Sequence, residues 1–149
     1  MVFHEGHGLY PIDAVHRTIE VKSTLKREHL QEAEEAALLL DPRNPDGLKI
    51  ASPGALEDSR SFYPFSAIFA FDADWGISAD SLPDGMKGES APCGLVSVAK
   101  RNFCAWHGID FKANSPAHAV RLFAFFILET IEASAASRSK FSLGVWLDI

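Results

Sequence analysis

The feature that most constrains the fold is an alternating run at residues 15–23 followed directly by an amphipathic segment at 25–40. Within the run, the apolar residues Ile19 and Val21 alternate with Glu20 and Lys22, which is the two-residue period of a β-strand. The apolar residues of segment 25–40 recur at helical spacing, at Leu30, Ala33, Ala37 and Leu40. The pattern predicts a strand leading into a helix, with Ile19 and Val21 buried and Glu20 and Lys22 on the opposite face.

The helix boundaries are indicated by their flanking residues. Ser23 or Thr24 is suited to cap the N-terminus of the helix, because a hydroxyl can accept a hydrogen bond from a free backbone N–H. Proline at position 42 ends the helix, since it disfavours helical geometry in the residue before it.

The remaining patterns predict a mixed sheet flanked by helices. Residues 65–71 form a buried central strand, 95–99 pair with 103–106 as a hairpin, and Ser115-Pro116 begins a helix that runs to about position 136. That helix is apolar nearly all round, so it is either buried on most sides or covers a sheet with one face and a partner subunit with another. A long polar loop covers 72–92, and short elements are expected at 48–50 and 143–147. The chain of 149 residues is therefore expected to be a single α/β or α+β domain.

Composition narrows the functional classes. The chain is 47% hydrophobic and 23% charged, as in a globular protein, and no apolar stretch reaches the length of a membrane span. The N-terminus has no signal-peptide pattern, so a cytoplasmic location is expected. The net charge of −6 argues against nonspecific nucleic-acid binding through a broadly basic surface. Cys93 and Cys104 lack metal-ligand spacing and are predicted to be partly buried free thiols.

Glu20 and Lys22 are the residues with the clearest chemical potential. A carboxylate and an ammonium side by side on a strand can hold a divalent metal and orient a water or a phosphate, although the same arrangement also makes an ordinary ion pair. Weaker candidates are His4 and His7, whose spacing differs from the zinc-protease pattern, and Asp72 with Asp74, which are also common turn formers. Trp75, Trp106 and His118 are interpreted as packing residues, and no hydrolase triad pattern is present in the sequence.

Residues 10–25, with the sequence Tyr-Pro-Ile-Asp-Ala-Val-His-Arg-Thr-Ile-Glu-Val-Lys-Ser-Thr-Leu, resemble an uncharacterised bacterial and phage family of restriction-endonuclease-like, PD-(D/E)xK nucleases. The similarity continues at 64–72 and more loosely at 122–131 and 145–147. It implies a restriction-endonuclease-like fold and metal-dependent phosphodiester cleavage. Glu20 matches the metal-binding acid of the motif, and Lys22 matches the lysine that positions the attacking water. A glutamine or glutamate on the flanking helix can assist.

The sequence departs from the family pattern before residue 10. The family's first helix and first acidic strand have no counterpart, so Asp13 or Glu5 would have to supply the second acid. The resemblance then implies Mg²⁺ held by Glu20 together with Asp13 or Glu5.

Two functions are consistent with these patterns. One is a magnesium-dependent nuclease acting on nucleic acid. The other is a catalytically inactive relative that binds a protein partner, for example as an inhibitor in phage–host conflict. In both cases the missing first strand predicts an unpaired sheet edge or an apolar patch. A homodimer or a stable heteromeric partner is therefore expected, and no membrane association.

Overall fold

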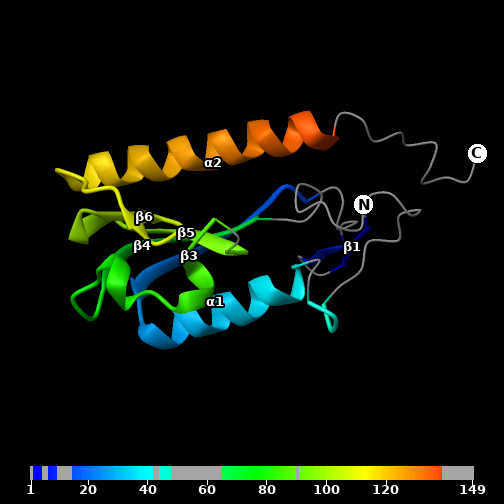
Figure 1. The fold of residues 1–149 in the computed structure, drawn as a ribbon, viewed down its shortest axis with the longest axis horizontal. Helices are drawn as coiled ribbons and strands as arrows, with labels where there is room; N and C mark the ends of the chain where they lie inside the picture. Colours follow the sequence, from blue (N-terminus) through cyan, green and yellow to red (C-terminus); the bar gives the residue numbers. More distant parts are fainter. Residues whose placement is uncertain are drawn as a thin grey trace, which may run out of the picture.

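A computed structural model describes residues 2–4, 7–9, 15–41, 44–47, 65–89 and 91–138. The fold is α+β, with a five-stranded mixed sheet between two helices (Figure 1). The sheet strands are β3 (Arg17–Leu25), β4 (Phe65–Ala73), β5 (Cys93–Val98), β6 (Phe103–Trp106) and β7 (Ile109–Asp110). The helices are α1 (Arg27–Leu39) and α2 (Pro116–Arg138), and each covers one face of the sheet. A separate hairpin joins β1 (Val2–His4) to β2 (His7–Leu9).

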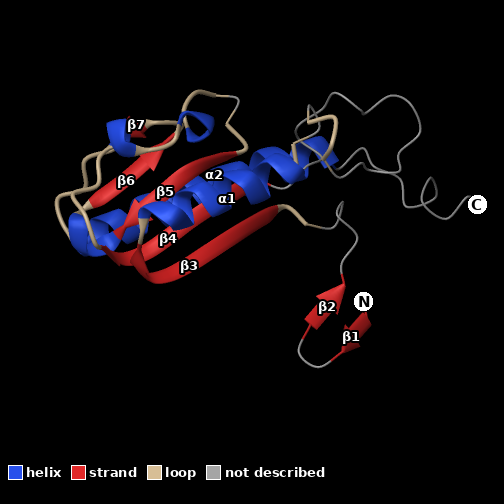
Figure 2. Cartoon of the chain, turned by 90° about the horizontal axis from the view of Figure 1, so that it is seen from below, coloured by secondary structure: helices blue, strands red, loops and turns tan. Residues whose placement is uncertain are grey.

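The strand order in the sheet follows the chain, from β3 at one edge to β7 at the other (Figure 2). β3, β4 and β5 run parallel, whereas β6 is antiparallel to β5 and β7 is antiparallel to β6. Adjacent parallel strands need a crossover connection, and α1 lies within the connection from β3 to β4. Among the described strands, β4 is the only partner of β3.

The turn between β6 and β7 is a two-residue loop with positive φ at both positions, 51° at His107 and 82° at Gly108. Positive φ at both loop positions is typical of a type I′ turn, whose twist matches the right-handed twist of the two strands that it joins. β7 was not predicted, because two residues carry too little alternation to identify a strand.

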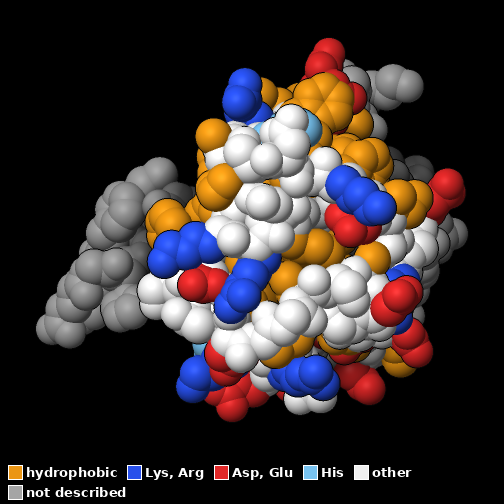
Figure 3. Space-filling view, turned by 90° about the vertical axis from the view of Figure 1, so that its left-hand side faces the viewer, with side chains coloured by type: hydrophobic (Ala, Val, Ile, Leu, Met, Phe, Trp, Pro, Cys, Tyr) orange, Lys and Arg blue, Asp and Glu red, His pale blue; other side chains and the backbone are white. Residues whose placement is uncertain are grey.

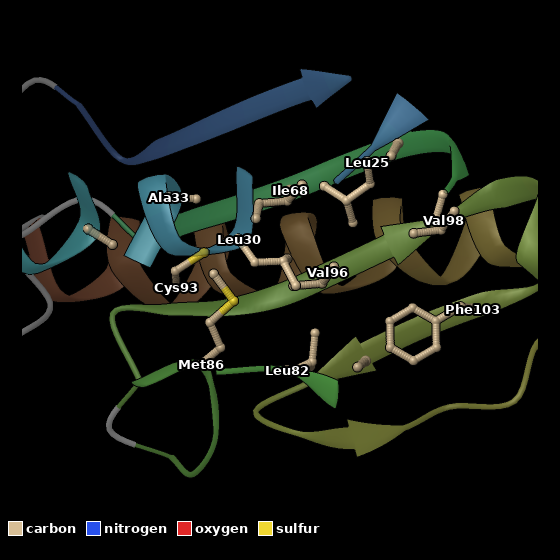
Figure 4. Packing of buried hydrophobic residues seen from close by; sticks show 14 residues of the cluster. Leu25, Leu30, Ala33, Ile68, Leu82, Met86, Cys93, Val96, Val98 and Phe103 are labelled. Carbon is tan, nitrogen blue, oxygen red and sulfur yellow. The ribbon is translucent and has the colours of Figure 1, made fainter. Parts of the chain in front are cut away.

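The larger core lies between α1 and the sheet (Figure 4). Leu30 on α1 faces Ile68 on β4 and Val96 on β5, and all three are at most 2% exposed. The second core lies under α2, where Phe123 contacts Phe69 with ring centroids 5.3 Å apart. The apolar side chains of β4 therefore pack into the cores on both faces of the sheet, as expected for a central strand.

Several boundaries differ from the sequence prediction. The first long strand spans Arg17–Leu25, so Ser23 and Thr24 lie inside it and do not cap the helix. His29 Nδ1 instead accepts the Lys26 backbone N–H at 3.2 Å. The second helix begins as predicted, since Ser115 Oγ accepts the His118 N–H at 3.1 Å. The elements expected at 48–50 and 143–147 lie outside the described residues.

The predicted burial of Ile19 and Val21 is wrong, because their side chains are 46% and 61% exposed. β3 is the edge strand, and α2 packs mainly over β5 and β6, so the helix leaves the outer part of this face uncovered. Of the two arrangements predicted for residues 122–128, burial on most sides is wrong, and the helix instead covers the sheet with one face. Phe125 and Leu128 on α2 are exposed, since only one side of the helix faces the sheet.

Candidate functional site

Glu20 and Lys22 lie on the same face of β3, as the alternation predicted. The register of the parallel pair places them beside Ile68 and Ala70 of β4, on the face that α1 covers. Lys22 Nζ is 2.6 Å from Glu20 Oε1, and the two side chains are 27% and 36% exposed. The pair is therefore an ion pair that is still accessible to a ligand from the edge of the sheet.

The charge state of Lys22 is determined mainly by Glu20. The hydrogen bond from the ammonium to the Glu20 carboxylate raises the pKa of Lys22, and the charges of Glu20 and Glu32 raise it further against the opposing effect of burial. Lys22 is consequently an ammonium at neutral pH. It can attract an anion or stabilise developing negative charge, but it cannot act as a general base.

The described residues do not by themselves fit a magnesium site. They contain no group of three or more His, Cys, Asp or Glu residues that could hold a metal ion. Magnesium is commonly bound by one or two carboxylates together with waters and substrate oxygens, and here Glu20 is already paired with Lys22. Asp13 and Glu5, the two predicted partners of Glu20, lie outside the described residues.

Asp72 stabilises the tertiary structure at the end of β4. Its Oδ1 accepts the Ala73 N–H at 2.8 Å and Arg101 Nε at 2.9 Å, and Lys100 Nζ is 3.8 Å from its Oδ2. The Ala73 N–H, followed by the Arg101 and Lys100 charges, lowers the pKa of Asp72 despite partial burial. Arg101 also donates to the Ala73 carbonyl at 2.5 Å. These contacts attach the 3₁₀ turn η5 (Ala99–Arg101) to β4.

Asp74 lies in an open hollow beside the start of α1. The hollow is also lined by Lys26, Arg27 and Glu28, and Lys26 Nζ pairs with Glu28 Oε1 at 3.4 Å. Because cationic and anionic groups alternate there, the hollow has no dominant charge that would select a ligand.

Two of the other predicted candidates, Trp106 and His118, make structural contacts. Trp106 stacks on Phe65 and Phe126, with ring centroids 5.4 Å and 4.7 Å away, which confirms its interpretation as a packing residue. His118 Nδ1 accepts the Asn114 N–H at 3.2 Å near the start of α2. His4 and His7 are paired positions in the β1–β2 hairpin.

Both cysteines are free and buried, as predicted. Burial is the main reason that the pKa of Cys93 and of Cys104 is raised to about 12. Such thiols remain protonated at neutral pH and are poor nucleophiles or metal ligands.

The contacts that join β3 to α2 were not apparent from the sequence. Arg17 Nε donates to Thr130 Oγ1 at 2.6 Å, and the same guanidinium also hydrogen-bonds the Thr130 carbonyl. His16 Nδ1 is 3.0 Å from Ser134 Oγ. These pairs are separated by more than a hundred residues, so no local motif could indicate them. They fix the beginning of the strand that carries Glu20 and Lys22.

No helix within the described part of the chain combines the length and apolarity needed to cross a membrane. Comparison with protein-family models, with curated proteins and with solved structures gives no match to this chain.

Proposed function

We propose that the chain is a nuclease-like domain of the PD-(D/E)xK class, in which Glu20 and Lys22 act on a phosphodiester. The observation that carries the proposal is the accessible Glu20–Lys22 pair on the face of β3 that α1 covers. The resemblance of residues 10–25 to that class supports the same assignment. The proposal includes a restriction-endonuclease-like fold.

The two side chains have different tasks in this proposal. Lys22 keeps its charge at neutral pH, so its ammonium attracts a phosphate oxygen and stabilises negative charge that develops during cleavage. The Glu20 carboxylate holds the ammonium in position and would be one protein ligand of a divalent cation, with Lys22 near the attacking water. Because one protein carboxylate is a minimal ligand set for a divalent cation, the proposal assigns the second acid to Asp13 or Glu5.

A second candidate function is supported by the molecular surface. Apolar side chains of Ile19, Val21 and Phe71 are exposed on the α2 side of the sheet. Acidic and basic groups are interspersed on the face drawn in Figure 3, and no continuous basic area covers it. With a net charge of −6, the chain repels a polyanion at long range. These features favour an inactive relative that binds a protein partner, such as an inhibitor in phage–host conflict.

The test is metal-dependent degradation of single- and double-stranded DNA and RNA by the parent, Glu20→Ala and Lys22→Ala proteins. Removing one electrostatic contact of this kind costs about 10²–10³-fold in rate, so both variants should lose activity that the parent shows with Mg²⁺ or Mn²⁺. Glu28→Ala and Lys26→Ala are matched controls, because they break an exposed ion pair elsewhere and should cleave like the parent.

Circular dichroism must show that all five proteins are folded. Asp13→Asn and Glu5→Gln then identify the second acid, since only the acid that completes the site should be needed for cleavage. A parent protein with no activity above the Glu20→Ala and Lys22→Ala variants, with either metal, would refute the nuclease proposal and leave the binding function.

A further inference from the structure

β3 is a long strand with one unpaired edge among the described residues. It contains nine residues, whereas β7 at the opposite edge contains two. Figure 2 shows β3 as the outermost strand of the sheet. Exposed edges of this length readily pair with another strand, and proteins commonly protect them with bulges, prolines or unpaired inward-pointing charges. β3 contains no proline, and its one lysine is neutralised by Glu20 on the same strand.

The sequence of β3 is self-complementary about its central residue, Val21. If two copies pair antiparallel with Val21 opposite Val21 of the second copy, each Glu20 lies opposite Lys22 of the other copy. In the same register Thr18 lies opposite Thr24 of the other copy. Opposite charges at directly facing positions stabilise an antiparallel pair. The one Glu20–Lys22 ion pair that forms within each strand could thus be replaced by two ion pairs between the strands.

We propose that the chain forms a two-fold symmetric dimer by antiparallel pairing of β3 with β3 of a second copy. A two-fold interface requires a surface that complements itself, and the charge pattern around Val21 meets that requirement in both directions. The exposed Ile19 and Val21 would lie together on the α2 side of the joined sheet. Phe71, which contacts Phe69 on that same side and is 53% exposed, lies on the adjacent strand of each copy.

The pairing also bears on the candidate site. Glu20 of one copy would be the diagonal neighbour of Glu20 of the other, and diagonal positions on one face are about 7–8 Å apart. Two carboxylates and two ammonium groups would then share one face of the dimer. The dimer itself does not depend on catalytic activity.

The test is a charge swap measured by size-exclusion chromatography with light scattering at tens of micromolar. The parent should be a dimer. Glu20→Lys and Lys22→Glu alone place like charges opposite one another, and each should raise the dissociation constant about 10- to 100-fold. An equimolar mixture of the two single variants should form a heterodimer, because every facing pair is then of opposite charge. The double variant E20K/K22E should restore the homodimer for the same reason.

Glu28→Lys and Lys26→Glu are the matched controls, since each makes the same change in net charge at an exposed ion pair at the start of α1. Both should remain dimers, and circular dichroism should show that every variant is folded. A monomeric parent would overturn the proposal. Occupation of the β3 edge by residues 139–149 or by a different protein would also overturn it. Single variants that dimerise like the parent, or a mixture that fails to form the heterodimer, would overturn it as well. The double variant separates dimerisation from catalysis, because it should dimerise while lacking any Glu20–Lys22-dependent cleavage.

Discussion

Replacing Ile68 and Ile19 separately by alanine compares one residue type in two environments on adjacent strands. Ile68 is 1% exposed and lies between β3 and β5, in register with Glu20 and Val96. It belongs to the core under α1. Truncating a buried isoleucine to alanine costs about 2–5 kcal/mol, because transfer free energy is lost and a cavity remains.

Ile19 should respond very differently. Full burial of an isoleucine contributes about 1.5–3 kcal/mol, and Ile19 is 46% exposed. Truncating Ile19 to alanine therefore removes only part of the burial free energy and leaves no closed cavity. We therefore expect Ile19→Ala to lower the free energy of unfolding by about 1 kcal/mol or less.

The measurement is urea unfolding followed by circular dichroism, at two protein concentrations that differ tenfold. Ile68→Ala should lower the midpoint at both concentrations by the same amount. The cost of Ile19→Ala should rise at the higher concentration if the β3 dimer contributes to stability. Equal destabilisation by the two substitutions at the lower concentration would show that the α2 side of β3 is covered, and would refute the exposure of Ile19.

Two further predictions concern ionisable groups. Cys93 and Cys104, with pKa values raised to about 12 by burial, should not react with a thiol reagent at pH 8 in the folded protein, whereas both should react at once in denaturant. The pKa of Asp72 is lowered in the folded protein, so its stabilising effect is present above its unfolded pKa of about 3.9 and is lost as the pH falls through the lower folded value. Asp72→Asn should therefore destabilise the protein at pH 7 and make the unfolding midpoint less dependent on pH below about pH 4. An unchanged pH dependence in this acid range would contradict the lowered pKa of Asp72 in the folded protein.

Local patterns in the sequence determined most elements of the sheet and both helices. The alternation around Glu20 and Lys22 placed the two side chains on one face of a strand, and the structure confirms this. Ser115-Pro116 marked the start of α2 because capping depends on neighbouring residues alone. The buried state of the two cysteines also agreed with their expected behaviour as small apolar side chains.

Only the tertiary structure decided which faces of these elements are buried. Ile19 and Val21 have the sequence pattern of core residues, yet they are exposed because β3 is at the edge and α2 packs mainly over β5 and β6. Strand order and helix placement depend on contacts between distant segments, such as Arg17 with Thr130, and periodicity does not encode such contacts. For the same reason the sequence could pair Glu20 with Lys22 and contains the self-complementary pattern around Val21, but it could not reveal that, among the described strands, this one lies at the edge of the sheet.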